Sequence, residues 1–86
     1  MKYYFSKKFE KKLDKLDAHI IKAFYKRFEL FCEDSFSTLL NNHSVNPPYH
    51  NTRSINITGD YRALFIEETE TSILFTNIGT HSELYD

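Results

Sequence analysis

The spacing of apolar side chains changes once along the chain, and this change sets the order of the secondary structure. Between Ser6 and Phe31, apolar residues recur at the intervals of three and four that one face of a helix requires. After Thr52 they alternate with polar residues or form short runs between turn residues, as strands do. Helices followed by a strand meander predict an α+β domain.

Two tandem helices are predicted in the first part of the chain, after a short aromatic strand at residues 2–5. Ser6 is a good N-cap residue for the first helix, whose narrow apolar stripe comprises Phe9, Leu13 and Leu16. Asp17 starts the second helix, whose wider stripe comprises Ile20, Ile21, Phe24, Phe28 and Phe31. The two helices form a hairpin, and residues 35–40 are expected to add one helical turn.

Three strands are predicted in the second part, after a loop at residues 41–52. The strands cover residues 54–58, 61–66 and 72–78, and the turns between them are residues 59–60 and the acidic residues 67–70. The resulting order is β-α-α-β-β-β. A helical hairpin covers one face of such a sheet, so we expect the other face to be available for function.

The length of 86 residues allows one domain, over residues 1–86, with a single core. The single Cys excludes an internal disulfide bond and a Cys-based zinc site, and His spacings typical of a metal site are missing, so no metal or cofactor is predicted. No run approaches the roughly 18 apolar residues of a membrane span, and the chain opens without a signal-peptide pattern. We therefore expect a cytoplasmic protein without a membrane partner.

The net charge of −1 hides a strong asymmetry between the two parts of the chain. Residues 1–27 contain nine Lys or Arg and three Asp or Glu, a net charge of +6, whereas residues 28–86 contain two and nine, a net charge of −7. Three lysines of the first helix fall on one flank of its apolar stripe, and they are Lys8, Lys12 and Lys15. This flank predicts contact with a phosphate-rich partner, because local field governs such encounters more than total charge. The alternative is a solvated helix edge.

No Gly-rich turn surrounds a Ser, which argues against a serine nucleophile. With metal chemistry excluded as well, a set of acid–base residues remains. The set comprises Arg53, Asp60, Arg62, His81 and Tyr85, and His81 stands where the last strand gives way to a short polar tail. In RNA cleavage a base removes the 2′-OH proton, an acid protonates the leaving 5′ oxygen, and an Arg stabilises the phosphorane. In the alternative reading Asp60 is only a turn residue. Arg62 then pairs with Glu67 or Glu68.

Four segments resemble a known protein family. They are residues 7–16 (KKFEKKLDKL), 40–43 (LNNH), 52–65 (TRSINITGDYRALF) and 78–85 (IGTHSELY). Together they are similar to the RelE/ParE superfamily of bacterial toxin–antitoxin toxins, and closest to its YafQ-like branch. The resemblance covers nearly the whole chain, and the last segment is its most specific part.

The resemblance implies a RelE-like (microbial-RNase-like) fold, with a four-stranded antiparallel sheet and a helical hairpin on one face. It also implies a toxin that cleaves mRNA in the ribosomal A site and is silenced by an antitoxin that wraps it. By motif position the implied catalytic residues are His43, Asp60, Arg62, His81 and Tyr85, of which His81 is the principal one. The expected contacts with RNA or the ribosome are Lys8, Lys12, Lys15, His50 and Arg53.

One position departs from the family pattern and keeps other functions open. Where YafQ-type enzymes commonly have a further His, this chain has Asn56, which cannot transfer protons, and His50 is a candidate to replace it. One alternative is a ParE-like inhibitor of DNA gyrase, which shares the fold but generally lacks the Gly-Thr-His-Ser-Glu-Leu-Tyr string. The other is a catalytically degenerate toxin that only binds its antitoxin.

Overall fold

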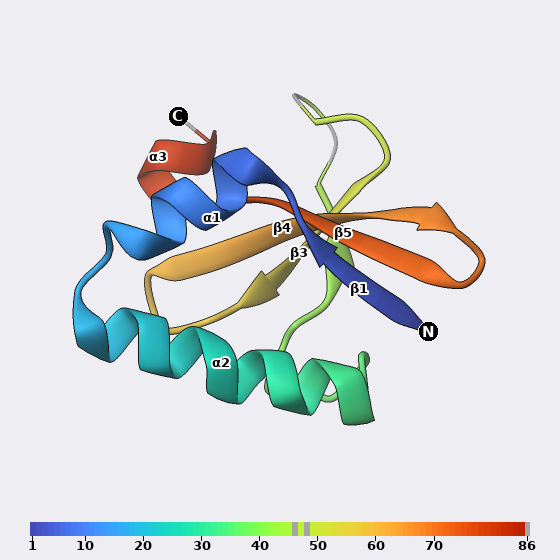
Figure 1. Cartoon of the computed structure of the whole chain (residues 1–86), viewed down its shortest axis with the longest axis horizontal. Coiled ribbons are helices and arrows are strands. Elements are labelled where there is room, and N and C mark those ends of the chain that lie inside the picture. Colours follow the sequence, from blue (N-terminus) through green and yellow to red (C-terminus); the bar gives the residue numbers. More distant parts are fainter. Residues whose placement is uncertain (46, 48, 86) are drawn as a thin grey trace.

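The α+β class and the order of the long elements are confirmed, and two short elements are added. The computed structural model describes residues 1–45, 47 and 49–85. Its elements are, in chain order, β1 (Lys2–Phe5), α1 (Lys7–Asp14), α2 (Ala18–Glu33), β2 (His43–Ser44), β3 (Thr52–Asn56), β4 (Tyr61–Thr69), β5 (Ser72–Thr80) and α3 (His81–Tyr85). Figure 1 shows α2 across one face of the sheet and both α1 and α3 near one end of it.

The sheet has five strands in the order β1-β5-β4-β3-β2. The fold class therefore holds, while the expected four strands become five and one pair differs in direction. β1 pairs in parallel with β5, from Lys2 opposite Ser72 to Phe5 opposite Phe75, and the other pairs are antiparallel. The parallel pair follows from the helical hairpin, which carries the chain away from β1 before the meander brings β5 back to it.

The extra strand, β2, lies in segment 41–52, which was expected to be loop. Both of its residues pair with β3. Asn41 and Asn51 turn the chain on either side of it with positive φ values of 47° and 51°, a conformation that Asn tolerates better than most residues. A strand of two residues leaves no periodic pattern in the sequence, which explains why the pattern did not predict it.

Two further segments differ from their predictions. β4 runs to Thr69, so Glu67 and Glu68 lie in the strand and not in the turn. A 2.8 Å hydrogen bond between the hydroxyl groups of Thr69 and Ser72 closes this hairpin. Glu67 and Glu68 are exposed, so both glutamates stay solvated within the strand. Residues 35–40 form turns and no helical segment.

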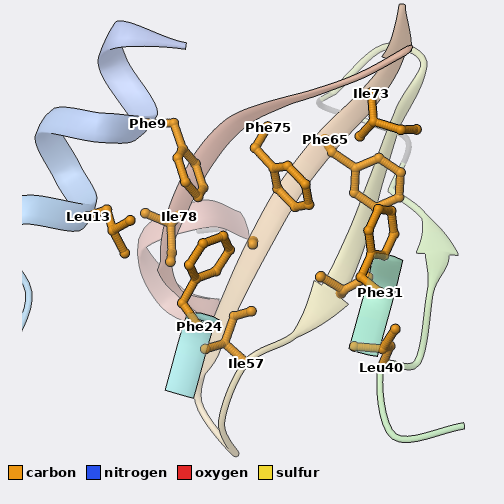
Figure 2. Packing of buried hydrophobic residues seen from close by; sticks show 12 residues of the cluster. Phe9, Leu13, Phe24, Phe31, Leu40, Ile57, Phe65, Ile73, Phe75 and Ile78 are labelled. Atoms are coloured by element: carbon orange, nitrogen blue, oxygen red, sulfur yellow. The ribbon is translucent and has the colours of Figure 1, made fainter. Parts of the chain in front are cut away.

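The main core lies between the helical hairpin and the sheet, and Phe75 is at its centre (Figure 2). Its fully buried ring lies 5.5 to 5.9 Å, between centroids, from six other phenylalanine rings, those of Phe5, Phe9, Phe24, Phe28, Phe31 and Phe65. Most of these pairs meet edge-on or tilted, which aromatic quadrupoles favour. Both predicted helical stripes therefore face the sheet.

The opposite face of the sheet, which was expected to be open, carries a second and smaller core. Ala63 and Phe65 of β4 belong to the main core, and Leu64 lies between them in the sequence. Because side chains alternate along a strand, Leu64 lies on the other face. The second core comprises Val45, Leu64 and Leu84, with Tyr49 and Tyr85 packed against it. The expectation of an uncovered face is wrong here, because α3, Val45 and Tyr49 cover part of β4.

Candidate active site

His81 and Asp60 meet where β5 ends and β4 begins. The register of the two strands places Tyr61 opposite Thr80, and the amide of His81 donates a 2.9 Å hydrogen bond to the carbonyl of Asp60. Both residues are exposed. The backbone therefore holds the two residues side by side, while the imidazole and the carboxylate remain accessible to a substrate.

Tyr85 lies one helical turn after His81, and the two ring centroids are 4.7 Å apart at an interplanar angle of 60°. Residues four apart share one side of a helix, which brings the rings together. The hydroxyl of Tyr85 is buried and has no hydrogen-bond partner among the residues that the structure describes. The geometry thus places the ring of Tyr85, and not its hydroxyl, in contact with His81.

A capping box starts α3 and makes His81 its first residue. The amide of Thr80 donates to Oε1 of Glu83 at 2.8 Å, and the amide of Glu83 donates to Oγ1 of Thr80 at 3.2 Å. Gly79 leaves room for this arrangement, since a Cβ there would lie 3.2 Å from Oε1 of Glu83. The Thr-x-x-Glu spacing signals such a helix start in the sequence, and the prediction of a polar tail overlooked it.

The surroundings of Glu83 stabilise the ionised form of its side chain. Hydrogen bonds with the backbone and side chain of Thr80 lower the pKa of Glu83 and outweigh the opposing effect of burial, and the nearby Lys12 lowers it further. Glu83 therefore stays ionised at neutral pH and caps α3 as a carboxylate.

Arg62 is anchored through a single nitrogen. Its Nη1 lies 3.0 to 3.2 Å from three carbonyl oxygens where the turn enters β4, those of Thr58, Gly59 and Tyr61. The hydrogen bonds of Arg62 go to this turn and not to Glu67 or Glu68. Within the described part of the chain, Nε and Nη2 make no hydrogen bond, and these two nitrogens form a fork that matches phosphate oxygens.

Asn56 borders the same cluster, because it lies opposite Arg62 in the register of β3 and β4. Its Oδ1 is buried and lacks a hydrogen-bond partner among the described residues. The position at which the family pattern has a further His is therefore adjacent to Arg62, and the residue present offers an acceptor but no titrating group.

The structure does not bring His43 and His50 into contact with this cluster. His43 lies on the edge strand β2, which β3 separates from β4, and its Nδ1 lies 2.7 Å from the carbonyl oxygen of Asn41. His50 is exposed between β2 and β3. The predicted replacement of the missing histidine by His50 has no contact in the structure to support it.

Arg53 lies on the helix-covered face of the sheet, because it alternates with Ser54 and shares a face with Ile55 of the main core. Its guanidinium donates to Oδ1 of Asn42 at 2.8 Å and to Oγ of Ser44 at 3.0 Å, and it stacks 5.5 Å from the ring centroid of Phe36. These contacts fix the start of β2 and leave Arg53 on the face opposite Arg62.

The lysine flank of α1 is only partly free. Lys8 and Lys15 are exposed, whereas Nζ of Lys12 donates a 2.7 Å hydrogen bond to Oδ1 of Asn77 in β5. Burial lowers the pKa of Lys12, Glu83 opposes this shift, and Lys8 adds to it. Lys12 therefore attaches α1 to the sheet, and the other two lysines face solvent.

The described residues contain no group of three or more His, Cys, Asp or Glu side chains that could hold a metal ion. In the same part of the chain, no helix has the length and apolar character needed to cross a membrane.

Comparison with known proteins adds independent findings. The model of one protein family matches residues 3–85, and it describes the ParE toxin of the type II toxin–antitoxin system parDE. No curated protein sequence matches the chain.

Several solved structures share the fold. YafQ from E. coli strain BL21(DE3) aligns with a TM-score of 0.81 at 14% identity, over 98% of this chain and 97% of that chain. The RelB–RelE antitoxin–toxin complex from Methanococcus jannaschii aligns with a TM-score of 0.71 at 26% identity, over 96% and 95%. The E. coli DinJ–YafQ complex aligns with a TM-score of 0.68 at 16% identity, over 98% and 97%.

Proposed function

This chain belongs to the ParE toxin family of type II toxin–antitoxin systems, and we propose that it is a YafQ-like endoribonuclease that cleaves mRNA on the ribosome. The observation that carries the proposal is the convergence of His81, Asp60 and Arg62 at one end of the sheet. A backbone hydrogen bond joins His81 to Asp60. Arg62 lies on β4 opposite Gly79 of β5, and Gly79 is two residues before His81. A proton donor or acceptor, a carboxylate and a phosphate-binding fork are the groups that RNA cleavage requires.

In the proposed reaction, His81 and Asp60 handle the two proton transfers. One group removes the proton of the 2′-OH, whose oxygen attacks the phosphorus, and the other protonates the departing 5′ oxygen. The products are a 2′,3′-cyclic phosphate and a free 5′-OH. Each such proton transfer contributes about 10²- to 10⁴-fold in rate, and Nε and Nη2 of Arg62 would stabilise the phosphorane charge. The ring of Tyr85 orients His81 and offers a surface for base stacking.

The ribosome is the proposed source of substrate positioning. Residues 28–86, which carry all the proposed catalytic groups, have a net charge of −7, and this charge predicts weak binding to free RNA. Lys8 on α1 and Lys15 at its C-cap are exposed and are the proposed contacts with ribosomal RNA.

The proposed protein partner is a cognate antitoxin. In the solved relatives, RelE is in complex with RelB and YafQ is in complex with DinJ. Phe36 and Leu39 are 68% and 62% exposed in this chain, and large exposed apolar side chains mark surfaces that bind other proteins. The turns after α2 are therefore a proposed part of the antitoxin interface.

Cleavage on purified ribosomes that carry a defined mRNA in the A site tests the proposed activity. We expect cuts with the wild type, and a loss of at least about 100-fold in rate with His81→Gln and with Asp60→Asn. His19→Gln is the matched control, because His19 is exposed on α2 and lies outside the candidate site. Equal rates for His81→Gln and the wild type would contradict the assignment.

Inhibition of DNA gyrase is the second candidate function, and the match to a ParE family model favours it. The fold does not separate the two activities. A supercoiling assay with purified gyrase separates them, because a gyrase inhibitor blocks supercoiling while translation in a parallel extract continues. If the protein affects neither reaction but binds an antitoxin, it is a degenerate toxin.

A further inference from the structure

We propose that Tyr49 is a positioning residue of the candidate active site, which fixes the short helix that carries His81 and Tyr85. The catalytic consequence of this proposal rests on the proposed ribonuclease function. The contact itself is a hydrogen bond of 2.6 Å from the hydroxyl of Tyr49 to the carbonyl of Leu84 in α3. It joins residues 35 positions apart in the chain.

The helix α3 needs external support because it has only five residues. Helices of this length do not persist without tertiary contacts, and the carbonyl groups of a last helical turn lack partners within the helix. The capping box and the amide of His81 hold the start of α3. At its end Leu84 is buried in the second core, and Tyr49 provides a donor to the Leu84 carbonyl.

Two ring contacts also connect Tyr49 to His81 through Tyr85. The ring centroid of Tyr49 lies 6.2 Å from that of Tyr85 at an interplanar angle of 85°. Tyr85 in turn lies 4.7 Å from the ring of His81. A displacement of Tyr49 would therefore release both the carbonyl end of α3 and the ring against which the imidazole packs.

The hydroxyl of Tyr49 is suited to this role. Burial raises its pKa, and the neighbouring Tyr85 adds to the shift, so the group remains a protonated donor at neutral pH. Tyr49 and Val45 both contact the second core. Val45 and Tyr49 thus support α3 from the side of the second core, and any ligand that displaces Tyr49 would also change the placement of His81.

NMR spectroscopy of the full chain tests the proposal without any assumption about catalysis. The ring current of Tyr85 changes the chemical shifts of the imidazole protons of His81. The variant Tyr85→Leu removes this ring current and so gives the reference shifts. Tyr49→Phe keeps the ring and removes only the hydrogen bond. We expect the His81 shifts in Tyr49→Phe to move toward this reference, and the amides of Leu84 and Tyr85 to exchange about 3- to 10-fold faster.

Tyr25→Phe is the matched control, since Tyr25 is 47% exposed and lies on α2. Amides of β5 serve as the internal standard for an intact fold. Unchanged His81 shifts and unchanged α3 exchange in Tyr49→Phe would overturn the proposal. On ribosomes we expect Tyr49→Phe to lower kcat with little change in KM. If the wild type does not cleave mRNA, the proposed function fails, whereas the NMR result still decides the role of Tyr49.

Discussion

Thr80 and Glu83 cap each other across the first turn of α3, each donating its amide to an oxygen of the other side chain. These bonds hold the pKa of Glu83 below its ordinary value of 4.5. A carboxyl group whose pKa is lower in the folded chain than in the unfolded chain stabilises the folded chain. This stabilisation is complete above the pKa of the unfolded chain and is lost as the pH falls through the pKa of the folded chain. The cap formed by Glu83 should therefore stabilise α3 at neutral pH and lose this effect in the acid range.

We predict that α3 loses its cap as the pH falls below 4.5, and that Glu83→Gln abolishes this dependence. Gln keeps an oxygen that can accept from the Thr80 amide but does not titrate. The measurement is the amide proton shift of Thr80 as a function of pH. The same acid transition in Glu83→Gln would assign it to another group.

Gly79→Ala is predicted to disrupt the same cap. The new Cβ would lie 3.2 Å from Oε1 and 3.5 Å from Cβ of Glu83, so the carboxylate must shift by a few tenths of an ångström, which weakens its hydrogen bond with the Thr80 amide. Loss of an N-cap costs about 0.5–2 kcal/mol, and we expect urea unfolding to show a loss of about 1 kcal/mol. Gly59→Ala is the control, because a Cβ there meets nothing within 4 Å. Equal stability of the two variants would show that Glu83 moves without cost.

Phe75→Ala is predicted to be among the most destabilising changes in the main core. It removes the ring on which six other phenylalanine rings converge, and such truncations cost about 3–5 kcal/mol. The measurement is the free energy of unfolding in urea, with Phe75→Leu as a milder variant if Phe75→Ala does not fold. Phe36→Ala should cost less than about 1 kcal/mol, because Phe36 is 68% exposed. A comparable loss in both variants would contradict the central role of Phe75.

Tyr85→Phe separates a function of the Tyr85 ring from a function of its hydroxyl group. Its hydroxyl is buried without a partner among the described residues, and such a group costs about 1–3 kcal/mol, so we expect Tyr85→Phe to be as stable as the wild type or more so. Cleavage should be retained if the ring is the functional part. A loss of cleavage with unchanged stability would instead assign a proton transfer to the hydroxyl.

The long elements could be predicted because each carries its own periodic pattern. The stripes of α1 and α2 and the turn at Gly59 and Asp60 needed only local information, and they place Asp60 and Arg62 at the start of β4. The parallel pairing of β1 with β5 could not be predicted in this way, because no local pattern records which distant strand is the partner.

The candidate site was predicted in part. Residue type and position put His81 and Asp60 in the acid–base set, the family resemblance implied their catalytic roles, and the structure places the two residues side by side. Tyr49 had no motif to mark it, since its contacts with Leu84 and Tyr85 exist only in the folded chain. Arg53 was grouped with Arg62 by residue type, and the alternation of β3 puts it on the opposite face.

The pairing of β1 with β5 also determines when this fold can form during synthesis. A ribosome makes residues 2–33 first, but β1 has no partner strand until residues 72–75 exist. Phe75, around which the rings of both helices pack, arrives at the same moment. The sheet therefore cannot close around Phe75 until residues 72–75 have been made, so the candidate active site at the end of β5 becomes ordered late in the formation of this domain.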